Sequence, residues 1–192
     1  MNLVFQKPLE FDFEGLRPEG AGTGAEGIRG KALWQGGKDW KFELHAEADR
    51  VALSDFQWVN PENLGGASGD LQGEITFKTD AHENTGFEVH LRVPEPGGNI
   101  PSKFFDLLLP YLPQLKNQEK IQEIRAIHRL LAYRNADLEI KLLASDKMKI
   151  AFHILIPDYN VDLHLKVDVR LDEKNAFRQL AQLAGLMQVT TS

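Results

Sequence analysis

The sequence predicts a mainly β fold of the α+β type, in which one long curved antiparallel sheet forms an open groove or a partial barrel. Two observations predict this fold. The segment 133–171 holds three runs in which nearly every second residue is apolar, separated by short turn sequences. The same alternation recurs in the first half of the chain, on both sides of the glycine-rich turn 36–39. Because side chains alternate between the faces of a strand, the pattern gathers the apolar groups on one face of a meander.

Each strand is expected where alternation is bounded by residues that favour turns. Lys7-Pro8 interrupts the first strand region, since proline removes a hydrogen-bond donor from the ladder. The glycine-rich segment 15–27 and the segment 60–69 are expected to be loops. We expect strands over residues 3–13, 28–34, 40–48, 51–58, 70–79, 85–94, 135–143, 147–156 and 160–171.

Three helices are expected, two of them between the strand blocks. Ser102 is positioned to cap a short helix over 103–109 that is apolar on nearly every side, and Pro110 ends it. Asn117 is positioned to cap a second helix that reaches about Leu131. The chain is interpreted as one β-rich domain over 1–192, part of a longer protein, with strand block 1–94, helical insertion 101–132, strand block 133–171 and C-terminal helix 173–188.

Composition and charge exclude several classes of protein. With 42% hydrophobic and 26% charged residues, the chain of 192 residues has an ordinary globular composition. Its 22 basic against 28 acidic residues give a net charge of −6 without a basic patch, which argues against nucleic acid as a partner. The absence of cysteine removes disulfides, thiol catalysis and thiolate metal sites. No apolar run approaches the roughly 20 residues of a membrane span, so the chain is either cytoplasmic or cut from a longer parent.

The sequence gives no support for an enzyme, a cofactor or a bound metal. No serine has the Gly-x-Ser-x-Gly setting of a nucleophile, and no buried pair of carboxylates is indicated for acid/base work. The six histidines are His45, His82, His90, His128, His153 and His164. None lies two or four residues from another, as a metal-binding strand or helix requires. His45, His90 and His164 fall on predicted polar faces of strands, so exposed strand histidines are the preferred interpretation.

The apolar residues carry the functional prediction. They form an ordinary core in the plainest interpretation, but the strands are many and long while the helices that can cover them are few. Apolar surface in excess of what the chain can bury marks a ligand groove or a partner interface. The expected lipid-contacting residues are Phe42, Leu44, Ile75, Phe77, Phe87, Val89, Leu91, Ile150, Phe152, Ile154, Leu163 and Leu165. The expected plug or docking helix carries Phe104, Phe105, Leu108, Leu109 and Tyr111.

Several segments resemble a known family. The glycine-punctuated strand entry 64–77, the segment 98–101 leading into 104–113, and the segment 133–136 leading into alternating strands resemble AsmA-like proteins, including their YdbH-type and TamB-type members. The resemblance extends over 65–171 and corresponds to the C-terminal region of the YdbH-type members. It implies a periplasmic protein, anchored in the inner membrane, that folds as a β-groove and conducts phospholipid acyl chains.

The chain is therefore interpreted as a lipid-binding or lipid-transfer domain of a bacterial envelope protein. Its expected partners are a phospholipid or another apolar ligand, with a membrane or an envelope protein as a further contact. The periplasm is the expected location, and the cytoplasm stays open. Two alternatives stand beside this interpretation: a closed lipocalin-like barrel that carries a small apolar ligand, and a structural module that pairs strands with copies of itself. The barrel predicts closure and a pocket, the groove predicts an open edge, and the module predicts neither pocket nor lipid.

Overall fold

The structure of the protein is a computed structural model. It describes residues 8–16, 27–56, 60–82, 84–109, 118–127, 129–144 and 147–170.

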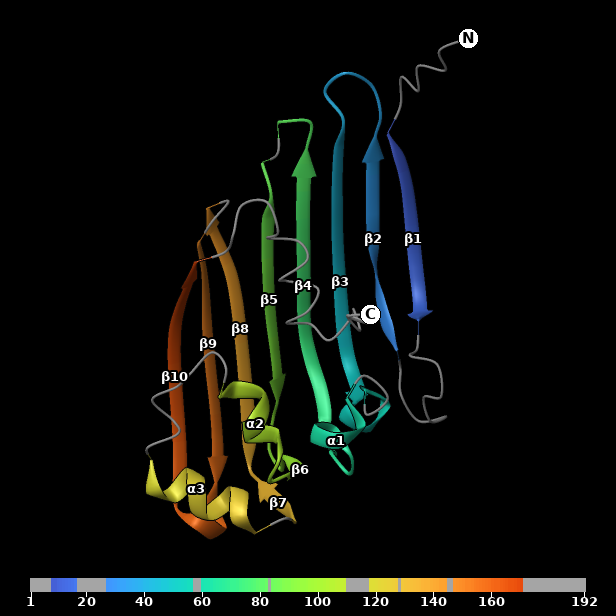
Figure 1. Cartoon of the computed structure of the whole chain (residues 1–192). Coiled ribbons are helices and arrows are strands. Elements are labelled where there is room, and N and C mark those ends of the chain that lie inside the picture. The colour runs from blue at the N-terminus through green and yellow to red at the C-terminus, as the bar shows by residue number, and fades with distance from the viewer. Residues whose placement is uncertain are drawn as a thin grey trace, which may run out of the picture.

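Most of the described residues belong to one antiparallel sheet of eight strands, in the order β1-β2-β3-β4-β5-β8-β9-β10. Its strands are β1 (Leu9–Leu16), β2 (Ile28–Gln35), β3 (Lys41–Ala52), β4 (Asp70–Asp80), β5 (Gly86–Val93), β8 (Asn135–Ala144), β9 (Lys147–Ile156) and β10 (Val161–Arg170). Pairing of β5 with β8 joins the two strand blocks into this sheet. Strands β1 and β10 form its opposite edges (Figure 1), so the described sheet is open, and the predicted open antiparallel fold is confirmed. The closed-barrel alternative is wrong.

The shorter elements gather at one end of the sheet (Figure 1). A second, two-stranded sheet pairs β6 with β7. The chain segment between these two strands contains helices α2 and α3, while α1 lies between β3 and β4. The bounds are α1 Pro61–Leu64, α2 Phe104–Leu108, α3 Glu119–Ala126, β6 Gly98–Pro101 and β7 Leu130–Tyr133, with 3-10 helices η1 at Leu53–Phe56 and η3 at Pro157–Tyr159.

The strand register keeps apolar residues opposite one another across the whole sheet. On β9, Phe152 lies opposite Leu138 of β8 and Leu165 of β10. Nearer the β1 edge, on the same face, Phe77 of β4 lies opposite Leu44 of β3 and Phe87 of β5. These pairs stack side chains about 5 Å apart, which is the unit of sheet stabilisation. One face of the sheet is therefore apolar from β1 to β10, as the alternation predicted.

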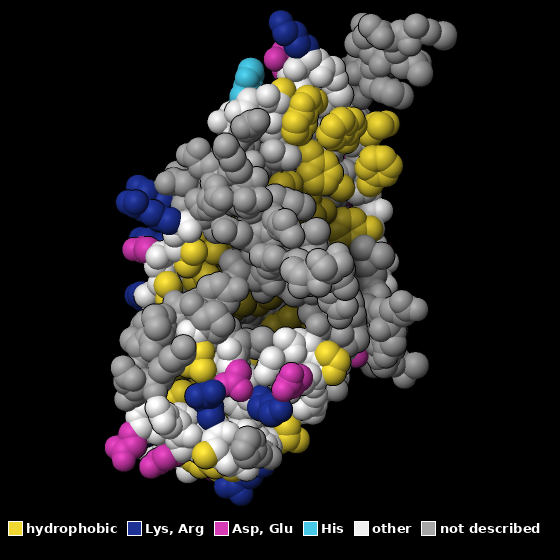
Figure 2. All heavy atoms as spheres, in the orientation of Figure 1, with side chains coloured by type: hydrophobic (Ala, Val, Ile, Leu, Met, Phe, Trp, Pro, Cys, Tyr) yellow, Lys and Arg dark blue, Asp and Glu magenta, His cyan; other side chains and the backbone are white. Residues whose placement is uncertain are grey.

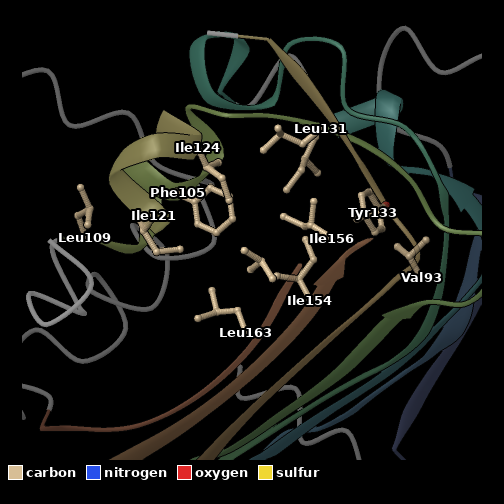
Figure 3. Packing of buried hydrophobic residues seen from close by; sticks show 12 residues of the cluster. Val93, Phe105, Leu109, Ile121, Ile124, Leu131, Tyr133, Ile154, Ile156 and Leu163 are labelled. Carbon is tan, nitrogen blue, oxygen red and sulfur yellow. The ribbon is translucent and has the colours of Figure 1, made fainter. Parts of the chain in front are cut away.

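The main core lies where α2 and α3 pack on this apolar face (Figure 3). Phe105 of α2 is fully buried, and Ile121 and Ile124 of α3 are 2% and 1% exposed. The buried cluster consists of Val93, Ile100, Phe105, Leu109, Ile121, Ile124, Leu131, Tyr133, Ile154, Ile156, Val161 and Leu163. Burying this many large side chains is the principal source of stability in such a domain.

Polar contacts fix the helices on this end of the sheet. The Arg125 guanidinium on α3 lies 2.6 Å from the Asp106 carboxylate on α2. The Lys120 ammonium donates to the carbonyl oxygen of Asn160, in the turn between β9 and β10, at 3.2 Å. Such partly exposed pairs contribute little to the free energy of unfolding, so their main effect is on the position of the helices.

Two predicted boundaries before β4 are wrong. The segment 51–58 is not a separate strand: β3 continues to Ala52 through a bulge between Ala48 and Val51, where Arg50 has a φ of 55°. The predicted loop 60–69 contains the short helix α1, which begins at the Asn60 cap, whose side chain accepts a hydrogen bond from the Asn63 backbone N–H. The extra residue of a bulge shifts the alternation of apolar and polar residues by one position. A prediction based on alternation alone therefore divides this one strand into two.

The insertion also differs from its prediction. Ser102 does not cap α2: it is 1% exposed, and its Oγ has no hydrogen-bond partner among the described residues. The second predicted helix ends too late, because Leu131 belongs to strand β7. Strand β6 lies where no strand was predicted, between the strand block 1–94 and the helical insertion. Pairing between 98–101 and 130–133 is non-local, so no pattern within either segment indicates it. Asn117 and the C-terminal helix 173–188 lie outside the described residues.

The buried position of Phe105 generates a prediction about stability. We expect Phe105→Ala to lower the free energy of unfolding by about 3–5 kcal/mol, because it removes a large ring from a packed core. The matched control is Phe11→Ala on β1, where the side chain is 56% exposed and the expected loss is below about 1 kcal/mol. Denaturant unfolding of both variants measures the difference, and equal losses would contradict the assignment of α2 to the core.

Candidate functional site

The apolar face of the sheet has two halves that differ in exposure. The covered half is the part on which α2 and α3 pack, and its residues Ile154 and Leu163 are 1% and 7% exposed. The open half lies on β1 to β4, where Trp34 is 38% and Phe11 is 56% exposed. Apolar side chains are exposed or half-buried in the open half, which consists of Leu9, Phe11, Trp34, Phe42, Leu44, Ile75 and Phe77.

A row of aromatic rings crosses the open half. Trp40 stacks on Trp34 with 5.7 Å between ring centroids. Phe42 continues the row, 6.5 Å from Trp34 and 6.1 Å from Phe77. Figure 2 shows hydrophobic side chains gathered near the turn that joins β2 and β3. Stacked and tilted rings stabilise one another while keeping a broad apolar surface, so the row forms a continuous aromatic surface.

Small residues lie between this aromatic row and the helical end of the sheet. Ala46 pairs with Gly30 on β2 and with Ile75 on β4. Gly73 follows on β4 with a φ of +145°, and a Cβ atom there would lie 1.9 Å from the carbonyl oxygen of His90, so glycine is required at this position. Ala46 is only 7% exposed, and the ring of Phe13 lies against Gly30. Larger apolar side chains therefore cover part of this stretch.

The opposite face of the sheet is polar and forms cross-strand ion pairs. Lys141 lies opposite Glu88 with 3.0 Å between the ammonium and carboxylate groups. Glu47 receives hydrogen bonds from His45 and Arg29, and these hold the pKa of its carboxyl group below the ordinary value. Two open hollows on this face are lined largely by charged and polar side chains of β1 to β4. They do not suit an apolar ligand, because charged groups lose solvation when an acyl chain covers them.

All twelve residues predicted to contact lipid lie on the apolar face, but the two halves divide them. Ile154 and Leu163 are in the core, and Phe152 and Leu165 pack against it. Val89 is 5% exposed. The remaining seven are half-buried: Phe42, Leu44, Ile75, Phe77, Phe87, Leu91 and Ile150. A ligand therefore has access chiefly to the residues on β3, β4 and β5.

The residues predicted for the plug helix lie at the covered end. Phe105 and Leu109 are core residues, 0% and 9% exposed, which leaves their side chains almost no surface for a membrane or a partner. Phe104 packs against Phe152 with 5.9 Å between ring centroids. The side chain of Leu108 and the whole of Tyr111 lie outside the described residues. Helix α2 is thus part of the core and covers this end of the apolar face.

The prediction missed part of the open half, namely Leu9, Phe11 and Trp34. The signal that identifies them is the same alternation that identified the other strands, since every second residue from Leu9 to Phe13 is apolar. Register then decides their position: Leu9 lies opposite Trp34, which lies opposite Phe42. These residues extend the apolar face to the edge of the sheet.

The fold and this face define an open antiparallel sheet protein with one continuous apolar face. No protein-family model, curated protein or solved structure matches the chain. The resemblance to AsmA-like proteins therefore stays a prediction. Within the part of the chain that the structure describes, no helix has both the length and the apolar character that crossing a bilayer requires.

The difference between the two halves generates a prediction about accessibility. Because the chain has no cysteine, a single introduced thiol is the only one to react. We expect Trp34→Cys in the open half to react with a water-soluble maleimide roughly 100-fold faster than Ile154→Cys in the covered half, since a buried thiol reacts only after local opening. Both variants should react at similar rates in denaturant. Similar rates in the folded protein would mean that the halves do not differ in accessibility.

Proposed function

We propose that the protein is a lipid-binding or lipid-transfer domain in which the open half of the apolar face contacts phospholipid acyl chains. One observation carries the proposal: large apolar side chains of the open half, Phe11 and Trp34 among them, stay exposed on a face whose other half forms the core. Continuous exposed apolar surface of this kind is characteristic of a binding site. We call this surface, with the aromatic row that crosses it, the trough.

The dimensions and energetics of this trough suit an acyl chain. Strand β2 has eight residues and spans about 26 Å, whereas one leaflet of the bilayer hydrocarbon is roughly 15 Å thick. Burial of about ten methylene groups gives about 8 kcal/mol, which corresponds to a Kd of about 1 μM before the cost of association is subtracted. Partial coverage of a chain on an open face therefore gives reversible binding, as transfer requires.

The resemblance to AsmA-like proteins supports a location and a context for this binding. A groove protein of that kind works in the periplasm, between the membranes of the bacterial envelope. The protein is then one domain of a longer parent, and the helices at the covered end stop the trough on one side. A membrane surface or an envelope protein is the further partner. In this account the acyl chain reaches the open half from the side away from α2 and α3.

A structural module that pairs strands with other copies is the second candidate. The edge strand β1 supports it, because Leu9 and Phe11 are exposed beside an unpaired edge of the described sheet. Charged residues alternate with them along the strand, namely Glu10, Asp12 and Glu14. Such charges disfavour edge-to-edge pairing of identical strands, so we rank lipid binding first.

Site-specific photocrosslinking tests the proposal at residues that face opposite sides of the same strands. Leu44 pairs with Phe77 on the apolar face, and Glu43 pairs with Lys78 on the polar face. We expect a photoreactive side chain at Leu44 or Phe77 to crosslink phospholipid from vesicles several-fold more than one at Glu43 or Lys78. The apolar positions are the ones in reach of an acyl chain.

The neighbours Phe152 and His153 on β9 extend this experiment to the covered half, with Phe152 on the apolar face and His153 as its control on the polar face. We expect weaker labelling at Phe152 than at Phe77, because Phe152 packs against the core. Equal labelling on the two faces would count against a lipid-binding trough. Crosslinks between protein chains through β1, without lipid, would favour the structural module.

A further inference from the structure

Two histidines meet on the polar face of the sheet, close to the turn between β9 and β10. His153 on β9 lies directly opposite His164 on β10. Their imidazole rings stack with 4.0 Å between centroids and an interplanar angle of 17°. His153 is half-buried and His164 is exposed. The stacked arrangement points both Nε2 atoms in one direction, toward a single neighbour.

That neighbour is a carboxylate. Asp162 on β10 has its Oδ1 atom 2.8 Å from the Nε2 of His153 and 3.0 Å from the Nε2 of His164. One ligand atom from each of the three residues lies within 4.8 Å of the other two. The Asp162 side chain is 60% exposed, so an ion from solution can reach its carboxylate.

A second carboxylate faces the other nitrogen of the half-buried ring. Asp137 on β8 lies opposite His153, with its Oδ2 atom 3.5 Å from Nδ1. A carboxylate on the far nitrogen of a histidine fixes the orientation and tautomer of the ring and raises the basicity of the nitrogen that binds a metal. Protein metal sites usually have a carboxylate in this outer position, and Asp137 lies close enough to occupy it.

We propose that His153, His164 and Asp162 bind a divalent transition-metal ion of the zinc type, with Asp137 as the positioning residue for His153. Two imidazole nitrogens and one carboxylate oxygen are a ligand set that such ions accept, with water in the remaining position. Two nitrogen donors disfavour Ca²⁺ and Mg²⁺, which prefer oxygen ligands throughout. The ion takes the place of the hydrogens that join the imidazoles to Asp162, and it links β9 to the edge strand β10.

The spacing of histidines in the sequence does not indicate this site. No second histidine lies two or four residues from His153 or His164, so a search along the chain finds no metal-binding pair. The signal lies in the hairpin register, which brings residues of successive strands together across the turn at 157–160. The prediction that no metal binds rests on spacing within single elements, whereas these ligands lie on two paired strands.

Calorimetric titration of the full chain with Zn²⁺, in protein without a histidine tag, tests the proposal. We expect one ion to bind per chain, and we expect this binding to be lost in His164→Ala and in His153→Ala. The matched control is His90→Ala, an exposed histidine on the same polar face, which should bind like the unchanged protein. Asp137→Asn should weaken binding by about 10- to 100-fold, the usual effect of removing an outer-shell carboxylate.

Thermal unfolding provides a second measurement. Since an ion that binds only the folded state raises its melting temperature, Zn²⁺ should stabilise the unchanged protein and His90→Ala but not His164→Ala. Circular dichroism of each variant without metal checks that it is folded. The proposal is overturned if no stoichiometric binding occurs, or if His164→Ala and His90→Ala bind Zn²⁺ equally, because either result means that the cluster is only a hydrogen-bonded histidine pair.

Discussion

Strand register is the constraint on which the rest of the structure depends. A slip of one residue between two strands would turn every apolar side chain of one strand to the polar face, so the pairing is strongly specified. The fixed register aligns Leu44, Phe77 and Phe87 across β3, β4 and β5. On the other face it brings His153 opposite His164. Both the apolar trough and the proposed metal site are therefore consequences of the same pairing.

In the proposed function, the two halves of the apolar face divide stability and binding between them. Helices α2 and α3 bury the covered half, and Phe105, Ile121 and Ile154 form a core with almost no exposed surface. In the open half, large rings lie at the surface, where they contribute less to folding than they would inside. The proposed binding uses both conditions, since the covered end holds the strands in place while the open end keeps accessible apolar surface.

The sequence predicted what alternation within a strand determines. Strand β9 begins and ends where it was expected, and the twelve predicted contact residues share one face. The wrong predictions are those in which contacts between distant segments determine the structure. Strand β6 pairs with β7 across the insertion, and Ser102, next to β6, is buried. Alternation does not indicate which half of the face α2 and α3 cover, so it groups Ile154 and Leu163 with accessible residues such as Leu44. Nor does it indicate the cluster of His153, Asp162 and His164, because these residues meet only when β9 and β10 pair.

Native mass spectrometry of protein purified without detergent tests the central claim most directly, because lipid held in the trough adds a mass that identifies it. We expect a population of monomers that carry one phospholipid. Phe77→Asp should reduce that population, since a charge in the trough removes apolar contact. The matched change Lys78→Asp on the polar face should leave it unchanged. Bare monomers, dimers without lipid, or equal lipid occupancy in both variants would contradict the claim.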